Sequence, residues 1–296
     1  MRSWQSVVFE KYLFMRGTKK KFINLQLMDQ FIAEKHNARP YELDKKFQDK
    51  HEINQFELNG MTYYVVNEQV NPKKVIFYFH GGAYINDPLI FHWRHLVKLA
   101  EKTNYTIVVP IYPKLPRFTY TDAFTAIHAL YDNLLERYNV PFIFMGDSAG
   151  GGLALALAQD VKLQSKKQPE HIVLYSPWLD VSGLNPEYQV VEKIDPMLGL
   201  VGAQKLGKLW AGQSDISNRL ISPINGPIEG IGKIALFVGS YEMLIVDAKM
   251  FLEKAKKEDV VISYFEYPKM NHVFPVFPIP EARQVLNMVV GIITED

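Results

Sequence analysis

Residues 142–158 read Phe-Ile-Phe-Met-Gly146-Asp-Ser148-Ala149-Gly150-Gly-Gly-Leu-Ala-Leu-Ala-Leu-Ala, which is an apolar run, a G-x-S-x-G segment and an alanine-rich stretch. The apolar run predicts a buried strand, and the alanine-rich stretch predicts a helix. A serine on such a tight strand-to-helix turn needs glycine two residues away on either side, because the adjoining chain leaves no room for side chains. The turn lifts the Ser148 hydroxyl clear of the sheet. It also places the Ala149 amide at a helix N-terminus, where a developing anion is favoured.

Seven further runs of β-branched and aromatic residues have the length of strands. With Phe142–Met145 they are Phe56–Leu58, Met61–Asn67, Val75–His80, Thr106–Tyr112, Ile172–Ser176, Ile234–Gly239 and Val260–Tyr267. Several are continuously apolar, as in parallel strands that helices cover on both faces. Helical spacing in residues 89–102, 121–138 and 149–163 alternates with them. We therefore predict an α/β protein with an eight-stranded, mostly parallel sheet flanked by helices, and a site at the carboxyl ends of its strands.

Two segments do not follow this alternation, although no repeat or flexible linker divides the chain and one domain over residues 1–296 is expected. Residues 1–50 are helical in pattern. Residues 183–220 form a long insertion between the sixth and seventh strands, with a helix expected through Leu200–Trp210. Such a long connection usually carries function or structure of its own. We expect the two segments to pack together as a helical cap over the site.

The composition excludes several classes of protein. The 33 basic and 32 acidic residues give a net charge of +1, which creates no overall field for nucleic acid. The absence of cysteine excludes disulfides, a thiolate nucleophile and cysteine-ligated metals. No uncharged stretch approaches the roughly 20 apolar residues of a membrane span, and the amino-terminal sequence lacks the apolar core of a secretory signal. We expect a cytoplasmic protein without integral membrane segments, and both a monomer and a homodimer are compatible with the sequence.

One local charge bias exists at the amino-terminal end. Residues 1–28 contain one acid, Glu10, and six basic residues: Arg2, Lys11, Arg16, Lys19, Lys20 and Lys21. The usual role of such a run is a solvated helix face. The alternative is a basic, aromatic flap that touches anionic lipid or substrate.

A second glycine-rich turn, His80-Gly81-Gly82-Ala83, follows the third predicted strand. Glycine allows the backbone to approach a bound carbonyl group closely. The amides of Gly82 and Ala83, with Gly81 as a further candidate, can therefore join that of Ala149 as donors to an oxyanion. We interpret His80 as an anchor of this loop and not as a base.

A serine hydroxyl is a poor nucleophile unless a base accepts its proton and an acid orients that base. In this topology the order along the chain is serine, acid, histidine. Of the eight histidines, only His171 and His272 follow Ser148. His171 precedes the sixth strand, at the wrong end of the sheet, whereas His272 lies in the loop after the eighth. We predict that His272 is the base.

The acid should follow the seventh strand. Glu242 lies three residues past Gly239, which closes that strand, and is the predicted acid. Asp247 is the alternative, although its expected place inside the next helix favours a solvated or capping role. Asp180, after the sixth strand, is a third candidate.

At these motifs the sequence resembles the hormone-sensitive-lipase-like branch of the α/β-hydrolases, which includes small bacterial esterases. His80-Gly81-Gly82-Ala83-Tyr84 is similar to the family's H-G-G-G-[FY] motif, and residues 146–151 match its G-D-S-A-G-G elbow at every position. Further matches are Ser176-Pro177-Trp178-Leu179-Asp180, Asp195-Pro196-Met197-Leu198 and His272-Val273-Phe274. The resemblance covers about residues 55–296 and implies an α/β-hydrolase fold with esterase activity.

Three positions depart from the family pattern. Ala83 replaces the third glycine, which keeps an amide but narrows the pocket by a methyl group. Glu242 stands where the family more often has aspartate. The family's Tyr-Arg-Leu-Ala-Pro-Glu segment is replaced by residues 112–117, Tyr-Pro-Lys-Leu-Pro-Arg, so no role of its arginine or glutamate carries over.

The predicted activity is that of a serine carboxylesterase, which hydrolyses short-chain, apolar carboxylic esters through Ser148, His272 and Glu242 by way of an acyl-enzyme. No cofactor or metal is expected, because His92 and His95 share a helix face but lack a third ligand of suitable spacing. Two alternatives remain open. The same triad could cleave an amide, carbamate or formamide, or the protein could be a hydrolase-like binder that does not cleave its ligand.

Overall fold

The computed structural model describes residues 2–295 and contains an eight-stranded sheet with the order β1-β2-β4-β3-β5-β6-β7-β8. The strands are β1 Ile53–Leu58, β2 Met61–Val66, β3 Val75–Phe79, β4 Thr106–Pro110, β5 Phe142–Asp147, β6 His171–Tyr175, β7 Lys233–Tyr241 and β8 Ile262–Asn271. Only β2 runs antiparallel to its two neighbours, and all other pairs are parallel. The predicted fold class is confirmed, with every strand at its predicted place to within a few residues.

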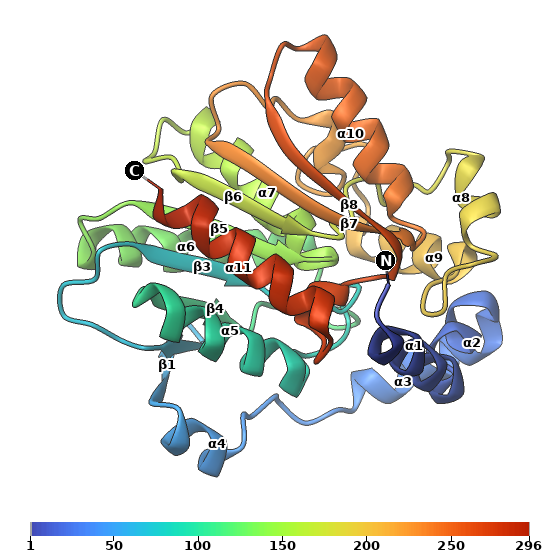
Figure 1. The fold of residues 1–296 in the computed structure, drawn as a ribbon, viewed down its shortest axis with the longest axis horizontal. Coiled ribbons are helices and arrows are strands. Elements are labelled where there is room, and N and C mark those ends of the chain that lie inside the picture. The colour runs from blue at the N-terminus through green and yellow to red at the C-terminus, as the bar shows by residue number, and fades with distance from the viewer. Residues whose placement is uncertain (1, 296) are drawn as a thin grey trace.

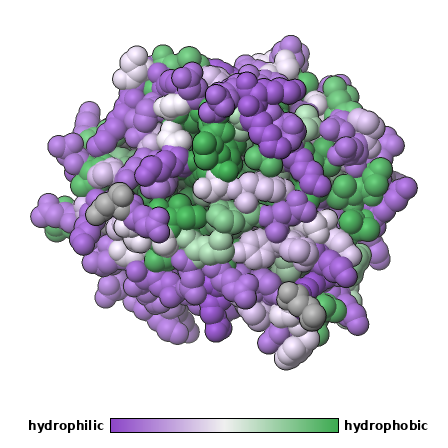
Figure 2. Space-filling model, turned by 45° about the horizontal axis from the view of Figure 1, so that its top comes forward, coloured by the Kyte–Doolittle hydropathy of each residue, from purple (hydrophilic) through white to green (hydrophobic). Residues whose placement is uncertain are grey.

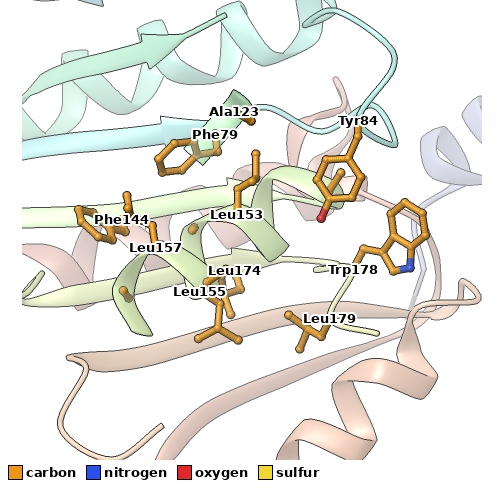
Figure 3. Packing of buried hydrophobic residues seen from close by; sticks show 14 of the residues in the cluster. Phe79, Tyr84, Ala123, Phe144, Leu153, Leu155, Leu157, Leu174, Trp178 and Leu179 are labelled. Carbon is orange, nitrogen blue, oxygen red and sulfur yellow. The ribbon is translucent and has the colours of Figure 1, made fainter. Parts of the chain in front are cut away.

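Five helices cover the sheet: α5 Ile90–Thr103, α6 Tyr120–Arg137, α7 Ala149–Leu163, α10 Ile245–Lys257 and α11 Pro280–Thr294. Helices α6, α7 and α10 pack on one face, where Phe77, Phe144 and Leu174 belong to their core. Helices α5 and α11 cover the other face (Figure 1). Tyr78 and Met145 belong to the core between them and the sheet. Successive residues of β3 and β5 thus enter opposite cores, which explains why these strands are apolar throughout. Figure 3 shows the first of these cores from nearby, with three leucines of α7 against the strands.

The amino-terminal helices α1 Trp4–Arg16, α2 Thr18–Ile23 and α3 Leu25–His36 gather beside the helices of the insertion, α8 Glu187–Val191 and α9 Leu200–Ala211 (Figure 1). The approach is close, because a Cβ at Gly202 would lie 2.6 Å from the Cα of Phe22. Lys19 adds a polar tie, since its Nζ donates to the Asp195 carbonyl at 2.7 Å. The two segments expected to form a cap therefore contact each other.

The expected cap boundary at residue 50 is wrong. Helix α4, Lys45–Lys50, packs against β1 on the other side of the molecule from α9 (Figure 1). Asp44 caps it by accepting a hydrogen bond from the Phe47 amide, and Gln48 is buried beneath it. The helical pattern of residues 1–50 predicted this helix, but helical periodicity does not say against which neighbour a helix packs.

Hydrophilic side chains cover most of the face shown in Figure 2, and hydrophobic ones form separate groups between them. Within residues 2–295, no helix combines the length and the apolar composition that crossing a membrane would require.

Candidate active site

The turn between β5 and α7 has the strained geometry that the G-x-S-x-G segment predicts. Ser148 has φ 54° and ψ −124°, in a region that side chains rarely adopt. A Cβ at Gly146 would lie 2.3 Å from the Gly150 carbonyl oxygen, and one at Gly150 would lie 2.0 Å from that of Phe79. Both contacts are far inside van der Waals distance, so only glycine fits on either side of the serine.

Ser148, His272 and Glu242 come together at the carboxyl edge of the sheet. The Ser148 Oγ lies 2.9 Å from His272 Nε2, and His272 Nδ1 lies 2.6 Å from Glu242 Oε2. The serine follows β5, the acid follows β7 and the histidine follows β8. All three are buried, with exposed fractions of 7%, 3% and 0% for serine, histidine and acid. The arrangement can pass a proton from the hydroxyl to an oriented imidazole.

The second oxygen of Glu242 is held by two donors. Its Oε1 accepts hydrogen bonds from the Gly239 amide at 2.6 Å and from the Ser176 hydroxyl at 2.7 Å. The Ser176 oxygen in turn accepts from the Val273 amide at 3.0 Å. One hydroxyl therefore fixes both the acid and the loop that carries His272. The sequence singled out Ser176 only as part of a family match, and no spacing rule would have revealed this role.

The pKa of His272 is raised above its ordinary value of 6.5. Burial acts to lower it, but the hydrogen bond and the negative charge of Glu242 outweigh burial, with further support from the charges of Asp195 and Asp147. Asp195 belongs to the insertion and is fully buried. Its side chain accepts hydrogen bonds from the amides of Met197, Leu198 and Met243, so it ties the insertion to the residue after Glu242.

Three backbone amides in the two glycine-rich turns have no hydrogen-bond partner within residues 2–295. Among residues 2–295, no hydrogen bond runs from the amides of Gly82, Ala83 or Ala149 to another group. Gly82 has φ 132° and Ala83 has φ 54°, so the turn after β3 follows a left-handed path. Pairing of β3 with β5 sets Phe79 opposite Gly146, which brings this turn level with the elbow. The two turns that carry these amides therefore lie next to each other at the carboxyl edge of the sheet.

Gly81 has to be removed from the predicted donors. Its amide already donates to Asp147 Oδ1 at 2.9 Å. Asp147 also accepts from the Tyr78 hydroxyl at 2.6 Å and contacts His92 Nε2 at 3.2 Å. Burial raises the pKa of Asp147, but the charge and hydrogen bond of His92, together with the other donors, bring it down to about 2. This carboxylate is ionised and pins the glycine-rich loop to the elbow.

The other histidines named in the sequence analysis lie outside the triad. His80 stacks on the Tyr112 ring, with centroids 4.6 Å apart, and its carbonyl accepts from the Tyr112 hydroxyl at 2.9 Å. His171 opens β6, at the amino edge of the sheet. His95 contacts the Tyr175 hydroxyl, whereas His92 contacts Asp147. Within residues 2–295, no group of three or more potential ligands is placed to hold a metal.

The two alternative acids lie elsewhere. Asp247 is in α10, as predicted, but the expectation of a solvated or capping role is wrong, because its side chain has no exposure. Its Oδ2 accepts from the amides of Leu179 and Asp180 at 2.6 Å and 2.9 Å, and its Oδ1 accepts from the Tyr188 hydroxyl. Asp180 Oδ1 accepts from the Ser182 amide. Neither carboxylate contacts His272.

An aromatic stack borders the site. Tyr84, directly after the glycine-rich turn, stacks on Trp210 of α9 and on Trp178, with centroid distances of 4.2 Å and 5.4 Å. Figure 3 shows Tyr84 and Trp178 beside the start of α7. A Cβ at Gly152, one turn along α7 from Ser148, would lie 2.9 Å from the Tyr84 hydroxyl. The room next to the nucleophile is therefore filled by aromatic side chains.

The segment that departs from the family pattern lines a separate cavity of about 300 Å³. Residues 35–41 and 111–118 form most of its walls, and neither Ser148 nor His272 does. Lys114 pairs there with Asp87 at 3.0 Å. The loop thus carries a local ion pair and has no contact with the triad.

Known proteins resemble this chain over most of its length. The family described as the alpha/beta hydrolase fold matches residues 76–276. The chain is 32% identical over 241 residues to a protein named esterase from Acinetobacter venetianus, and the match covers 79% of each. It is 29% identical to a protein named triacylglycerol lipase from Mycobacterium tuberculosis, over 72% of this chain and 45% of that one. A solved structure described as a "putative esterase" from Staphylococcus aureus superposes with a TM-score of 0.87 at 33% identity, covering 93% of this chain and 95% of the other.

Proposed function

The chain belongs to the α/β-hydrolase family, in its hormone-sensitive-lipase-like esterase branch, and from that premise we propose that it is a serine carboxylesterase for short-chain, apolar esters. Its relatives are named esterase, lipase and acetyl-hydrolase, and ester hydrolysis is the activity they share. The observation that carries the mechanism is the unbroken line from the Ser148 Oγ through the His272 ring to Glu242, at 2.9 Å and 2.6 Å.

In the first half of the reaction Ser148 Oγ attacks the ester carbonyl carbon while His272 Nε2 takes the hydroxyl proton. Glu242 keeps the other ring nitrogen protonated and stabilises the imidazolium that forms. The tetrahedral intermediate then collapses, the bond to the leaving alcohol breaks, and His272 returns its proton to that alcohol. The acyl group remains on Ser148.

In the second half a water molecule takes the place of the alcohol. His272 removes one of its protons, the oxygen attacks the acyl carbonyl, and the bond to Ser148 breaks as the proton returns to the serine oxygen. The free acid leaves, and the enzyme is restored without any external reductant or oxidant.

The amides of Gly82, Ala83 and Ala149 are the proposed oxyanion donors in both halves. They are fixed by the sheet register and by the Asp147 contact with Gly81, so they need no reorganisation when charge develops. Each such donor is worth about 3 kcal/mol in the transition state, which corresponds to a factor of about 10² to 10³ in rate.

The aromatic stack supports the preference for short acyl chains. Tyr84, Trp178 and Trp210 fill the space one turn along α7 from the nucleophile, so a long chain would have to displace large rings. Residues 183–220, which supply Trp210, and the helices α1–α3 that pack on them are proposed to act as the cap over this site.

The test is hydrolysis of p-nitrophenyl esters from two to twelve carbons, by the native chain and by Ser148→Ala. We expect the rate to fall steeply with acyl length and the variant to lose at least about 10⁴-fold in kcat. Unchanged circular dichroism of the variant is the control for folding. Turnover retained by Ser148→Ala would refute the mechanism, and rates rising with chain length would refute the short-chain preference.

Two further measurements address the alternatives on the same triad. Matched ester and amide substrates distinguish an esterase from an amidase, carbamate hydrolase or formamide hydrolase. A fluorophosphonate probe should label Ser148 in the folded native chain, because the serine has an oriented base. Failure to label would instead favour a non-catalytic binding protein.

A further inference from the structure

Helix α1 exposes large apolar side chains that a helix on a globular protein usually buries. Its inward side carries Ser6 and Leu13, whereas the side chains of Trp4 and Met15 are 72% and 86% exposed. The Ser6 hydroxyl donates to Glu281 at the start of α11, which holds this side of the helix against the protein. Trp4, Val8 and Met15 recur at helical spacing and so form one outward face, with Lys11 among them.

The exposed apolar side chains of the protein concentrate at this end. Among residues 2–295, nine of the 21 exposed large hydrophobic side chains lie within residues 4–27. They include Phe14 on α1 and Ile23 and Leu25 at the junction of α2 and α3, which pack beside α1 (Figure 1). Scattered exposed apolar residues are ordinary, but a gathering of this density marks an interaction surface.

The same residues hold the positive charge. Residues 1–28 carry six basic residues and one acid, while the whole chain has a net charge of only +1, so the remainder is net acidic. Glu10 pairs with Arg2 at 2.8 Å. Helix α3 adds two acids, Asp29 and Glu34, and one basic residue, Lys35, and Asp29 pairs with Lys205 outside these helices, so the positive excess remains. Lys11, Lys20 and Lys21 are exposed, and none of them makes an ion pair within residues 2–295.

We propose that α1, α2 and α3 form a docking surface for anionic lipid, on which the apolar side chains enter the headgroup boundary and the lysines contact the lipid phosphates. An interfacial helix needs both components, since neither apolar burial nor charge alone gives firm attachment. This inference goes beyond the proposed activity and does not depend on catalysis.

A second copy of the chain fits this surface less well. In a two-fold symmetric pair the same patch meets itself, so two clusters of lysine would face each other. A nucleic acid would satisfy the lysines but would leave the apolar face exposed. An anionic lipid surface complements both features.

The surface is connected to the candidate active site. Lys19 of α2 donates to the Asp195 carbonyl, and the Asp195 side chain accepts from the amide of Met243, next to Glu242. Ester substrates that partition into lipid would therefore be met on the side of the molecule where the proposed cap lies.

Tryptophan fluorescence provides the direct test, because Trp4 is the exposed one of the four tryptophans. Trp93 and Trp210 have no exposure and Trp178 has 5%. Adding vesicles of phosphatidylcholine with phosphatidylglycerol to the full chain should shift the emission to the blue, and pure phosphatidylcholine should do so much less. Trp4→Phe should lose the shift yet still co-sediment with anionic vesicles, since phenylalanine is also apolar.

Two sets of variants separate the components of the surface. Lys11→Glu with Lys20→Glu should weaken co-sedimentation by more than about 25-fold, at about fivefold or more for each charge. Trp4→Ser with Met15→Ser should weaken it at least tenfold. The matched control is Val70→Ser with Val261→Ser, which removes two side chains that are 93% and 88% exposed elsewhere and should leave binding unchanged.

The rate of each variant on p-nitrophenyl acetate, measured without vesicles, reports on the triad separately from vesicle binding, so failure of the proposed catalytic mechanism would not be mistaken for failure of docking. Equal sedimentation with neutral and anionic vesicles, or an equal loss in the Val70 and Val261 control, would overturn the proposal. Concentration-dependent dimerisation that Trp4→Ser with Met15→Ser abolishes, without vesicle binding, would assign the surface to a second copy of the chain.

Discussion

Glu242 and Asp247 lie five residues apart, and neither side chain is exposed to solvent, yet their surroundings differ completely. Glu242 contacts the imidazole of His272, a group that gains and loses a proton. Asp247 contacts only fixed donors, namely two backbone amides and the Tyr188 hydroxyl. Burial alone therefore does not identify a catalytic acid. The group that the carboxylate contacts indicates whether its role is catalytic or structural.

The surroundings of Asp247 also affect its charge. Burial raises the pKa of Asp247 from 3.8 to about 7, and the hydrogen bonds from Tyr188, Asp180 and Leu179 only partly offset this. With no cation in contact, the ionised form has to be stabilised by dipoles alone. Asp247 thus connects the loop after β6 to α8 and α10, at a cost that grows when it ionises.

The largest expected effect is on the catalytic side of the comparison. Glu242→Gln should lower kcat for p-nitrophenyl acetate by about 10⁴-fold, because an amide does not hold the imidazole in the required tautomer or stabilise its charge. Asp247→Asn should lower kcat by less than about threefold. Steady-state kinetics of the two variants side by side measure the difference, and a larger loss for Asp247→Asn would mean that the roles are exchanged.

Removing the support of the acid should have an intermediate effect. Ser176→Ala deletes the hydroxyl that bonds both Glu242 and the Val273 amide, which should cost about 1–3 kcal/mol, or about 5- to 150-fold in kcat. The KM should change little, because Ser176 does not face the substrate. Ser182→Ala, whose hydroxyl accepts only from the Leu184 amide, is the matched control. Equal losses in the two variants would indicate a general folding defect.

The architectural side of the comparison predicts a dependence of stability on pH. The folded pKa of Asp247 lies above its unfolded value, so the folded state binds more protons between about pH 4 and pH 7, and stability falls as the pH rises through that window. Asp247→Asn removes this contribution, so its melting temperature should fall less between pH 5 and pH 8 than that of the native chain. Parallel curves for the two proteins would contradict the raised pKa.

The smallest expected effect is a shift in the pH dependence of activity, and it comes from a third buried acid, Asp195. Asp195 helps to raise the pKa of His272, so Asp195→Asn should lower that pKa and extend activity to lower pH. The base must be neutral to accept the serine proton, which makes the acid limb of kcat/KM the relevant measurement. Asp215→Asn, at an exposed aspartate in the same segment, should leave the limb in place. If the acid limb of the Asp195→Asn variant moved toward higher pH, a charge effect of Asp195 on His272 would be excluded.

Most of the fold was predictable because its signals are local. The apolar runs placed all eight strands, and the elbow motif fixed the turn where β5 meets α7. The chain order and the carboxyl-edge rule led to His272 and Glu242 from sequence alone, and the structure brings both to Ser148. Each of these rules uses only residues that are close together in the sequence, or the direction in which a strand runs.

The missed features depend on contacts between distant segments. Asp147 lies inside the elbow motif, but only the fold shows that its carboxylate takes up the Gly81 amide. The burial of Asp247 arises from the loop after β6 folding onto α10, which helical position could not reveal. Helix α4 had the right periodicity and the wrong predicted neighbour. For Asp147 and Asp247 the deciding partner is dozens of residues away, whereas α4 packs on β1, the strand that directly follows it.

The alignment of Phe79 with Gly146 across β3 and β5 has a consequence for how this protein could diversify. The proposed oxyanion donors take their positions from strand pairing in the centre of the molecule, whereas Trp210 of the aromatic stack beside the site comes from residues 183–220. Substitutions in that insertion, at positions other than Asp195, can therefore change which molecules are accepted while the triad stays intact. Protein engineering could therefore vary residues 183–220 and keep β3, β5 and the turns that follow them unchanged.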